Sequence, residues 1–424
     1  MLCAATGLTM HSWPAKSCAG SGHVGTRLQV PTLDAFMFSP FVCRTRRSKM
    51  EAEGRRRDGG LRPGFCCREL ELREFHDKYV IRSLDPNVRD QAFSVSRLDG
   101  DIRPLTGDAN LETPTEVSQI FGVAGILRLL AGTFVLIITS RKEVGSYLGF
   151  PIYSAKTMKF LSCNDVRRTS QKRNERYFMS LLRIVESTPG LYYSYEIDLT
   201  LNLQRACMLD EGRFSKPLWK QADPRFIWNR NLLEDLIEHK LDAFAIPFIQ
   251  GSFQTTEFTV KKIPAKVTLI SRRCNRRLGT RMWRRGANLE GDTANFVETE
   301  QLLEAEGCTS SFLQVRGSIP LLWQQIVDLS YKAKLEIIGH EETAKVVERH
   351  FNDLIQRYGT IAVLDLTDNH GDEGKLSCAF AAEIEKLPLV RYVSFDFHYH
   401  CAKGKLDNLK ILYNEIAEDV QTQG

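Results

Sequence analysis

The sequence predicts an α+β domain followed by an α/β domain. Between residues 70 and 214, short apolar runs alternate with turns, which is typical of strands in antiparallel sheets. From residue 335 onward, strand-like and helix-like segments alternate, which indicates parallel strands joined by helices. The chain has 424 residues, 43% of them hydrophobic, and is therefore long enough to bury a large core in more than one domain.

The first domain is predicted over residues 67–215. Apolar and aromatic runs are expected to form its strands, at 79–81, 92–95, 133–138, 145–149 and 151–153. A helix is expected over 173–187, and residues 192–195 are expected to return as a strand. The longest apolar stretch, 120–138, has the length of a membrane span, but Arg128 lies at its centre. Because a charge there is costly in a bilayer, we predict that this stretch is buried core.

The second domain is predicted over residues 216–424. A helix over 231–240 and a strand over 265–270 are expected first. The alternating part is expected to contain strands at 335–339, 361–366 and 391–399 and helices at 341–358, 376–387 and 409–420. Gly359 fits a helix carboxyl cap. In such a layer ligands bind beyond the carboxyl ends of the strands, where Asp365, Asn369 and His370 follow one strand.

The amino end differs from the rest of the chain. Residues 1–60 hold nine Lys or Arg and four acids, a sum of +5, which equals the formal net charge of the whole chain. We interpret residues 1–66 as a disordered segment or an alternative leader. An organelle transit peptide is the other reading, but a convincing amphipathic helix is lacking. The remaining residues are neutral overall.

A concentrated basic block lies inside this balanced body. Between Lys261 and Arg285 there are ten Lys or Arg residues and no Asp or Glu. A surface usually mixes both signs, because crowded cations repel one another. The block therefore predicts a binding surface for a multiply anionic partner. Its one aromatic residue, Trp283, fits either a core position or a membrane-facing wedge.

The cysteines indicate thiols and no metal site. There are eleven, an odd number, without a Cys-x-x-Cys pair or zinc-finger spacing, which favours reduced thiols in a cytosol-facing protein. The expected strand 391–399 would place Asp396, His398 and His400 on one face, beside Cys401, which also allows a metal site. Hydrogen-bonding roles are commoner for such residues, and we predict no metal and no cofactor.

Several segments resemble the Sac-domain phosphoinositide phosphatases. Residues 271–286, read together with 294–300, resemble the signature block of that family, and 314–323 resemble its next block. Residues 121–132, 226–229 and 395–398 are also similar. The resemblance covers roughly residues 70 to 420. It implies an enzyme that removes phosphate from inositol lipid headgroups at membrane surfaces, on the endoplasmic reticulum or Golgi, although no second stretch of span length occurs in this chain.

The sequence departs from the family at the nucleophile. The family's loop, approximately Arg-x-Asn-Cys-x-Asp-Cys-Leu-Asp-Arg-Thr, is expected after Phe395 and does not occur. We therefore expect an incomplete catalytic domain of the Cys-dependent phosphatase type, in a carboxy-terminally truncated member that is inactive alone. Two other cysteines precede an arginine at the right spacing, Cys67 before Arg73 and Cys207 before Arg213. We reject both, because each intervening loop holds two carboxylates that would repel phosphate.

What remains is a predicted headgroup-binding surface. Guanidinium groups match phosphate oxygens, and surface cations attract anionic lipid. The candidate substrate-binding residues are Arg272, Arg273, Arg277, Arg281, Arg284, Arg285, Arg316, Asn295, Asp396 and His398. The plainer interpretation is that several of the arginines pair with acids elsewhere in the fold. A catalytically silent phosphoinositide-binding module is the main alternative function. Nucleic-acid binding is disfavoured, because the block lacks interleaved aromatic residues for base stacking.

Overall fold

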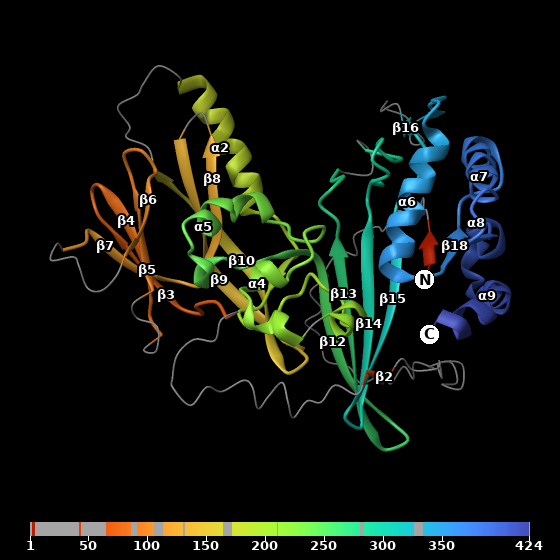
Figure 1. The fold of residues 1–424 in the computed structure, drawn as a ribbon, viewed down its shortest axis with the longest axis horizontal. Coiled ribbons are helices and arrows are strands. Elements are labelled where there is room, and N and C mark those ends of the chain that lie inside the picture. The colour runs from red at the N-terminus through yellow and green to blue at the C-terminus, as the bar shows by residue number, and fades with distance from the viewer. Residues whose placement is uncertain are drawn as a thin grey trace, which may run out of the picture. The chain divides into compact units, whose positions relative to one another are not determined.

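The computed structural model divides the chain into two compact units. It describes residues 2–4, 42–43, 65–85, 91–105, 113–129, 132–163, 172–209, 211–279, 284–325 and 334–423 (Figure 1). One unit, here called the antiparallel unit, comprises 43–276 and 297–311. The other, called the α/β unit, comprises 1–42, 277–296 and 312–424. Residue 215 lies inside the antiparallel unit, and the domain boundary at 215/216 stays a prediction. The expected leader, 1–66, falls almost entirely outside the described residues.

The antiparallel unit begins with a five-stranded sheet. Its strands are β3 (Leu70–Glu74), β4 (Lys78–Ser83), β5 (Ala92–Ser96), β6 (Ile102–Leu105) and β7 (Glu116–Ile120). The order is β6-β5-β4-β3-β7, and every neighbouring pair is antiparallel. Alternate residues are buried, as Phe93 and Val95 in β5 illustrate. The strands predicted at 79–81 and 92–95 are therefore confirmed.

A second antiparallel run of strands follows in the same unit. It comprises β8 (Val123–Leu129), β9 (Gly132–Tyr147), β10 (Phe150–Cys163), β11 (Leu191–Tyr193), β12 (Ile249–Val260), β13 (Ile263–Arg273) and β14 (Val297–Ala305). Each strand pairs antiparallel with the next. The described residues of the stretch 120–138 form the end of β7, all of β8 and the start of β9, and their apolar side chains are mostly buried, as predicted. In the described residues, no helix is long and apolar enough to span a membrane.

Glycine permits one close approach in this unit. Gly125 in β8 has a φ of 138°, and a Cβ atom there would lie 2.4 Å from the carbonyl oxygen of Leu232. Leu232 ends the short 3-10 helix η5 (Arg230–Leu232). Any side chain at position 125 would therefore push η5 away from the sheet.

Short helices connect the strands of the antiparallel unit. The predicted helix at 173–187 is confirmed as α2 (Lys172–Glu186). The helix expected over 231–240 is shorter, because η5 occupies its first residues and only α5 (Glu234–Glu238) is α-helical. The remaining short helices are α3 (Leu203–Met208), η4 (Glu211–Ser215), α4 (Leu218–Gln221) and η6 (Asp242–Phe244).

The α/β unit is built on parallel strands. β1 (Leu2–Ala4) lies parallel to both β15 (Cys308–Arg316) and β18 (Ile361–Asp365), and β18 lies parallel to β19 (Val390–Ser394). All five residues of β18 are buried, which confirms the prediction of a strand covered on both faces. The unit boundary falls within β15. β2 (Val42–Cys43) is the remaining strand near the amino end.

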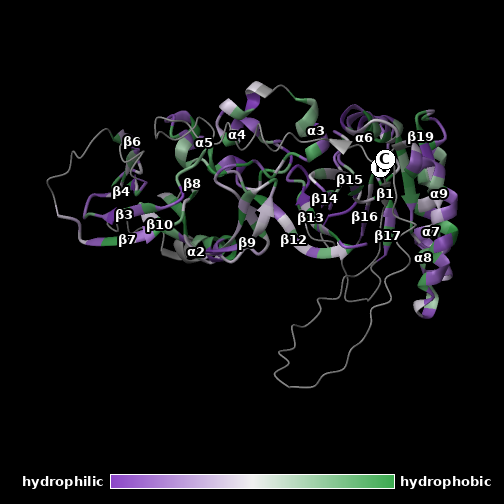
Figure 2. Ribbon diagram, turned by 90° about the horizontal axis from the view of Figure 1, so that it is seen from below, coloured by the Kyte–Doolittle hydropathy of each residue, from purple (hydrophilic) through white to green (hydrophobic). Residues whose placement is uncertain are grey.

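Three long helices belong to the α/β unit. They are α6 (Thr343–Tyr358), α7 (Gly371–Ile384) and α9 (Leu409–Gln423). α6 and α9 lie close to their predicted positions, whereas α7 begins five residues before the predicted start at 376. Gly359 caps α6 with a φ of 81°, and its N–H donates to the Ile355 carbonyl, as expected. Figure 2 shows hydrophobic and hydrophilic residues together on α7 and α9, which is typical of helices that cover a sheet. Leu364, Val393 and Ile416 form a small core between strands and α9.

Two expectations about this unit are wrong. The strand at 335–339 exists as β17 (Leu335–Ile337), but it pairs with β16 (Trp323–Gln325) in a separate two-stranded sheet. The strand over 391–399 ends at Ser394, and α8 (Phe397–His400) follows. The cause is Asp396, whose side chain accepts a hydrogen bond from the Tyr399 N–H and caps the helix. The 3-10 helices η7 (Ala402–Gly404) and η8 (Leu406–Asn408) lead to α9.

Candidate functional site

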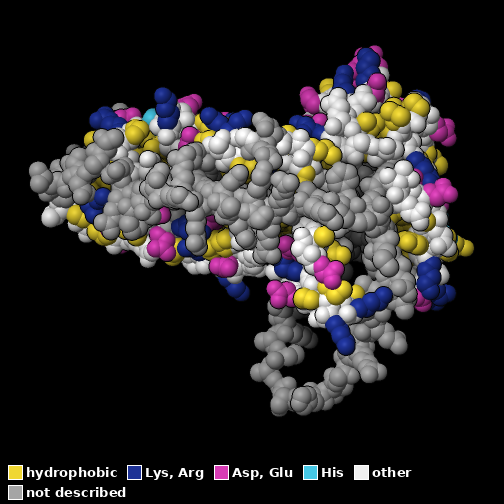
Figure 3. All heavy atoms as spheres, turned by 60° about the horizontal axis from the view of Figure 1, so that its bottom comes forward, with side chains coloured by type: hydrophobic (Ala, Val, Ile, Leu, Met, Phe, Trp, Pro, Cys, Tyr) yellow, Lys and Arg dark blue, Asp and Glu magenta, His cyan; other side chains and the backbone are white. Residues whose placement is uncertain are grey.

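The surface outside the basic block carries both signs of charge. On the face shown in Figure 3, Lys and Arg side chains are interspersed with Asp and Glu. Many of these cations are paired, as Arg128 is with Asp235 and Arg391 with Asp419. A group of cations without carboxylate partners would therefore stand out from the rest of the molecule.

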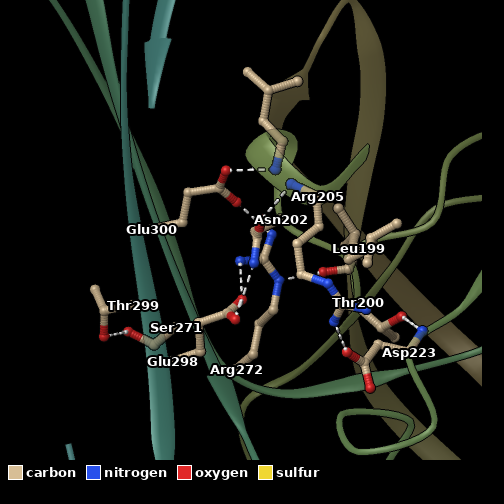
Figure 4. Close-up of polar contacts among 12 residues, drawn as sticks. Leu199, Thr200, Asn202, Arg205, Asp223, Ser271, Arg272, Glu298, Thr299 and Glu300 are labelled. Atoms are coloured by element: carbon tan, nitrogen blue, oxygen red, sulfur yellow. Dashed lines mark hydrogen bonds and ion pairs between the residues drawn. The ribbon is translucent and has the colours of Figure 1, made fainter. Parts of the chain in front are cut away.

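Arg272, the first arginine of the block, is a structural residue. Its side chain is 0% exposed. Its Nη1 donates to Glu298 at 3.1 Å, its Nη2 donates to Glu300 at 2.6 Å, and its Nε donates to the Leu199 carbonyl at 2.5 Å (Figure 4). Burial alone would lower the pKa of Arg272, but Glu300 and Glu298 outweigh burial and raise it. Since its guanidinium is enclosed, we do not carry Arg272 into the proposed binding surface.

The two glutamates are themselves fully bonded. Glu298 accepts from the Asn202 side chain at 3.0 Å, and Glu300 accepts from the Leu203 N–H at 2.7 Å. Asn202 also caps α3 by accepting from the Arg205 N–H. The network therefore joins β13 and β14 to the start of α3 within the antiparallel unit. Removing any one charge would leave the others buried and uncompensated.

The next residues of the block also anchor the chain. Asn275 donates its side-chain N–H groups to the carbonyls of Pro224 and Ile227. Asn229, nearby in the segment 226–229, binds the Ala124 and Ile246 carbonyls and the Phe248 N–H. Asn275 and Asn229 thus hold loops together by hydrogen bonding. Arg273 is half-buried on β13. Arg281 and Trp283 lie outside the described residues.

The last arginines of the block form a separate group in the α/β unit. We call Arg277, Arg284 and Arg285 the cationic turn. Arg277 and Arg285 are in contact, because the Arg277 Nη2 donates to the Arg285 carbonyl at 3.0 Å. Arg285 lies with its guanidinium 5.5 Å from the Trp323 ring centroid and donates to Gln325 at 2.8 Å. Asn295 lies beside the turn and donates to the Arg284 carbonyl at 3.4 Å.

The positive charges of Arg277 and Arg284 in the cationic turn repel each other. Burial lowers the pKa of Arg277, and the neighbouring Arg284 lowers it further, while Asp292 and Glu290 oppose this only in part. The Nε of Arg277 is buried without a hydrogen-bond acceptor. Among the described residues, neither Arg277 nor Arg284 forms an ion pair, and Arg284 is exposed. Two neighbouring guanidinium groups in this state favour a bound anion, because an anion relieves their repulsion.

The chain that follows the cationic turn is held by several contacts. Gly286 follows the turn with a φ of 61°, and a Cβ atom there would lie 2.5 Å from the Leu321 carbonyl oxygen. Its own carbonyl accepts from the Ala294 N–H at 2.9 Å. Helix α6 contacts the loop that follows Gly286, because Arg349 donates to the Leu289 carbonyl and His350 forms a hydrogen bond with the Gly291 carbonyl through Nδ1. These contacts hold the residues that directly follow Arg284 and Arg285 in the chain.

Asp396 and His398 lie at the carboxyl ends of β18 and β19. Asp396 is buried, and its two oxygens accept from the N–H groups of Asn369 and Tyr399 at 3.0 and 2.8 Å. Burial raises the pKa of Asp396, but these hydrogen bonds, with His370 and His398, outweigh burial and lower it. His398 is exposed, and its Nδ1 lies 2.5 Å from an Asp368 oxygen. Both residues were expected on one face of a strand, and this is wrong, because β19 ends at Ser394, Asp396 caps α8 and His398 lies within that helix.

The described cysteines are free thiols, and most are unsuited to nucleophilic attack. Cys66, Cys67 and Cys163 are buried, and burial raises the pKa of Cys67 to about 11 and that of Cys163 to about 12. Cys207 lies within helix α3, and Arg213 lies in η4. Neither arrangement is a loop of N–H groups around a thiolate. Within the described ranges, no group of three potential metal ligands comes together.

The fold and its sequence blocks define the family. The family model for the SacI homology domain matches residues 121–402, and the chain therefore belongs to this family.

Named relatives agree with this assignment. The phosphoinositide phosphatase SAC8 of Arabidopsis thaliana is 60% identical over 84% of this chain and 61% of its own length. The phosphatidylinositol-3-phosphatase SAC1-B of Danio rerio is 33% identical over 81% of this chain and 59% of its own length. SAC1 of Saccharomyces cerevisiae is 31% identical over 78% of this chain and 54% of its own length. The chain thus spans between about half and three fifths of these relatives.

The partners of Arg272 were not foreseen from the sequence. The block itself contains no acid, but Glu298 and Glu300 lie on the neighbouring strand β14. Their spacing of two residues is a usable signal, because alternate residues of a strand share a face. Two acids on the buried face of a strand require cations, and an arginine on the paired strand is the natural partner.

Proposed function

We propose that this chain binds phosphorylated inositol headgroups of membrane lipids through the cationic turn. The observation that carries the proposal is that the Nε of Arg277 is buried without an acceptor beside a second cation, Arg284, and that neither arginine forms an ion pair among the described residues. A phosphomonoester supplies the missing anion, and guanidinium groups bind its oxygens in pairs. The names of the relatives, which are phosphoinositide phosphatases, support the same class of ligand.

Other candidate residues extend the surface. Arg281, Arg285 and Arg316 remain in the proposal as further cations for the headgroup. Arg273 lies in the antiparallel unit and stays a separate candidate for binding anionic lipid. Asp396 is proposed as a positioning residue, because both of its oxygens already accept backbone hydrogen bonds. His398 is proposed to contact the ligand, since its ring is exposed and Asp368 orients it through Nδ1.

We further propose that this polypeptide belongs to an enzyme that hydrolyses phosphomonoesters of inositol lipids. The polypeptide alone is proposed not to catalyse this hydrolysis. Phosphatase chemistry of the Cys-dependent kind needs a low-pKa thiolate in a loop of N–H donors. Cys67 has a raised pKa, and Cys207 lies in a helix. The resemblance to family members alone suggests the cytosolic face of endoplasmic reticulum or Golgi membranes.

The second candidate function is that of a silent phosphoinositide reader. The same two observations favour it, a cationic turn that can hold phosphate and cysteines that are not poised for attack. A reader and a silent part of an enzyme bind the same ligand. An experiment separates them, in which the two fifths of a relative such as SAC8 that this chain does not match are added to the chain. Phosphate release would then indicate a silent part of an enzyme, and no release would indicate a reader.

Vesicle flotation tests the binding proposal. The full chain is expected to float with vesicles that contain a phosphatidylinositol monophosphate and to prefer them over vesicles of equal charge made with phosphatidylserine. The double variant Arg277→Gln/Arg284→Gln is expected to lose this preference. The matched control Lys405→Gln/Lys410→Gln changes two exposed cations of the same unit and is expected to keep it. If the first variant keeps the preference, the proposal is wrong; displacement by single-stranded RNA would favour nucleic-acid binding instead.

A further inference from the structure

Helix α2 is already packed on one side. Leu182 is 3% exposed and belongs to the core beneath it, and Val185 packs against that core. Glu186 fixes the helix to strand β10, because its Oε1 accepts from the Phe160 N–H at 2.7 Å. Figure 1 shows α2 alongside the strands β8 and β10 of the same unit. The fold therefore needs no further apolar residues on this helix.

The helix nevertheless carries a second apolar stripe. Tyr177, Leu181 and Ile184 are 62%, 40% and 64% exposed. Their spacing of four and then three residues places them on one face of a helix. The packed residues Leu182 and Val185 occupy the adjacent face. Three large apolar side chains in a row, turned to solvent on one ordered helix, indicate a surface that contacts something else.

Cations accompany the exposed stripe. Residues 164–187 contain six Lys or Arg and three Asp or Glu, a net charge of +3. At 100° per residue, Arg183 lies next to the stripe, on the side opposite the packed face, and it is exposed. The helix therefore combines a packed face, an exposed apolar stripe and an exposed cation within a segment of net positive charge.

We propose that α2 docks onto an anionic lipid surface. Amphipathic helices with a basic face lie in the interface of a bilayer, with the apolar stripe in the headgroup boundary and the cations beside lipid phosphates. A single exposed helix face that is not part of a groove can dock onto a lipid surface, because such a surface is fluid and apolar and carries diffuse negative charge. This proposal rests on the proposed function in that both place the chain at a membrane. It differs because α2 requires any anionic lipid and no phosphorylated inositol.

The test uses vesicles without phosphoinositides. The full chain is floated with neutral phosphatidylcholine vesicles and with vesicles that also contain phosphatidylserine. We expect binding to the anionic vesicles, weakened by salt, and a loss of at least about tenfold in the variant Tyr177→Ser/Leu181→Ser/Ile184→Ser. The matched control is Leu98→Ser/Val117→Ser/Met208→Ser, which removes three apolar side chains of the same unit that are 66%, 53% and 71% exposed. The control is expected to bind as the unaltered chain does.

A second measurement does not depend on a variant. Anionic vesicles are expected to slow amide hydrogen exchange over residues 172–186 of the unaltered chain, while neutral vesicles leave it unchanged. Undiminished vesicle binding of the α2 variant, equal loss in the control, or no protection of α2 would each overturn the inference. Binding of a soluble headgroup by the α2 variant separates the two proposals, because the cationic turn is intact there.

Discussion

At the scale of single residues, the arginines of one basic block have different roles. Arg272 lies between two buried carboxylates, whereas Arg284 is exposed and its charge lowers the pKa of Arg277. The first stabilises the fold, and the second is one of the arginines that we propose to bind a ligand. Charge counting along the sequence cannot separate them, because the carboxylates that neutralise Arg272 come from a different strand.

Replacing Arg272 by Met is expected to destabilise the chain strongly. Glu298 and Glu300 would stay buried without a cation, which costs roughly 3–5 kcal/mol of unfolding free energy. Chemical denaturation measures the change. The triple variant Arg272→Met/Glu298→Gln/Glu300→Gln should recover much of the loss, and Arg284→Met should be nearly neutral. A neutral Arg272→Met would contradict the structural role.

His350 is expected to make stability depend on pH. Burial lowers its pKa from 6.5 to about 4, against smaller opposite effects of Gly291, Asp353 and Asp292. Between these values the unfolded chain binds a proton that the folded chain does not, so stability falls as pH drops from 6.5 towards 4. The full loss is about 3 kcal/mol.

Denaturation at several pH values checks this dependence. The variant His350→Asn keeps a donor that can reach the Gly291 carbonyl but does not titrate in this range. Its unfolding free energy should vary less between pH 6.5 and 4 than that of the unaltered chain. Equal slopes in the two proteins would show that His350 is not the group responsible.

At the scale of elements, Asp396 decides where a strand ends. It accepts the Tyr399 N–H as the amino-terminal cap of α8 and also binds the Asn369 N–H. Replacement by Ala is expected to cost about 1 kcal/mol at neutral pH through the lost cap. The same substitution is expected to speed hydrogen exchange over residues 397–401.

The pH dependence of this effect has a definite sign. The pKa of Asp396 is lowered in the fold, so its contribution is present above the ordinary aspartate pKa and disappears as pH falls through the folded value. The stability difference between the unaltered chain and Asp396→Ala should therefore shrink in acid. The unfolding free energy of Asp396→Asn, whose side chain can still cap the helix, should lie between those of the unaltered chain and Asp396→Ala. A difference between the unaltered chain and Asp396→Ala that persists in acid would show that the carboxylate is not its cause.

The secondary structure could be predicted where the pattern was long and local. The continuous apolar run at 361–366 and the helical spacing of 341–358 gave β18 and α6 close to their true limits. The alternation over 391–399 was misleading, because a two-residue period does not reveal that one polar residue caps a helix. The pairing of β17 with β16 was equally hidden, since partner choice depends on tertiary contacts.

At the scale of the whole molecule, the candidate site could be predicted only in part. The sequence indicated a cation-rich segment, and the structure divides that segment, with Arg272 in the antiparallel unit and the cationic turn in the α/β unit. The sequence singled out Asp396 and His398 but placed them within a strand, whereas the structure places them after the end of β19. Their bonding partners, Asn369 and Asp368, depend on loop geometry that the sequence does not encode locally.

The purified chain is expected to release no phosphate from a phosphatidylinositol monophosphate. The raised pKa of Cys67 and the helical setting of Cys207 are the reasons. A phosphate-release assay with the unaltered chain and with Cys207→Ser checks this. Turnover that Cys207→Ser abolishes would show that a cysteine of this chain does act as a nucleophile.

The central claim is that the cationic turn holds a phosphorylated headgroup, and calorimetric titration with a short-chain phosphatidylinositol monophosphate tests it most directly. The unaltered chain and Lys405→Gln/Lys410→Gln should bind alike, and Arg277→Gln/Arg284→Gln should bind at least about tenfold more weakly at unchanged stability. Equal affinity of all three proteins would contradict the claim.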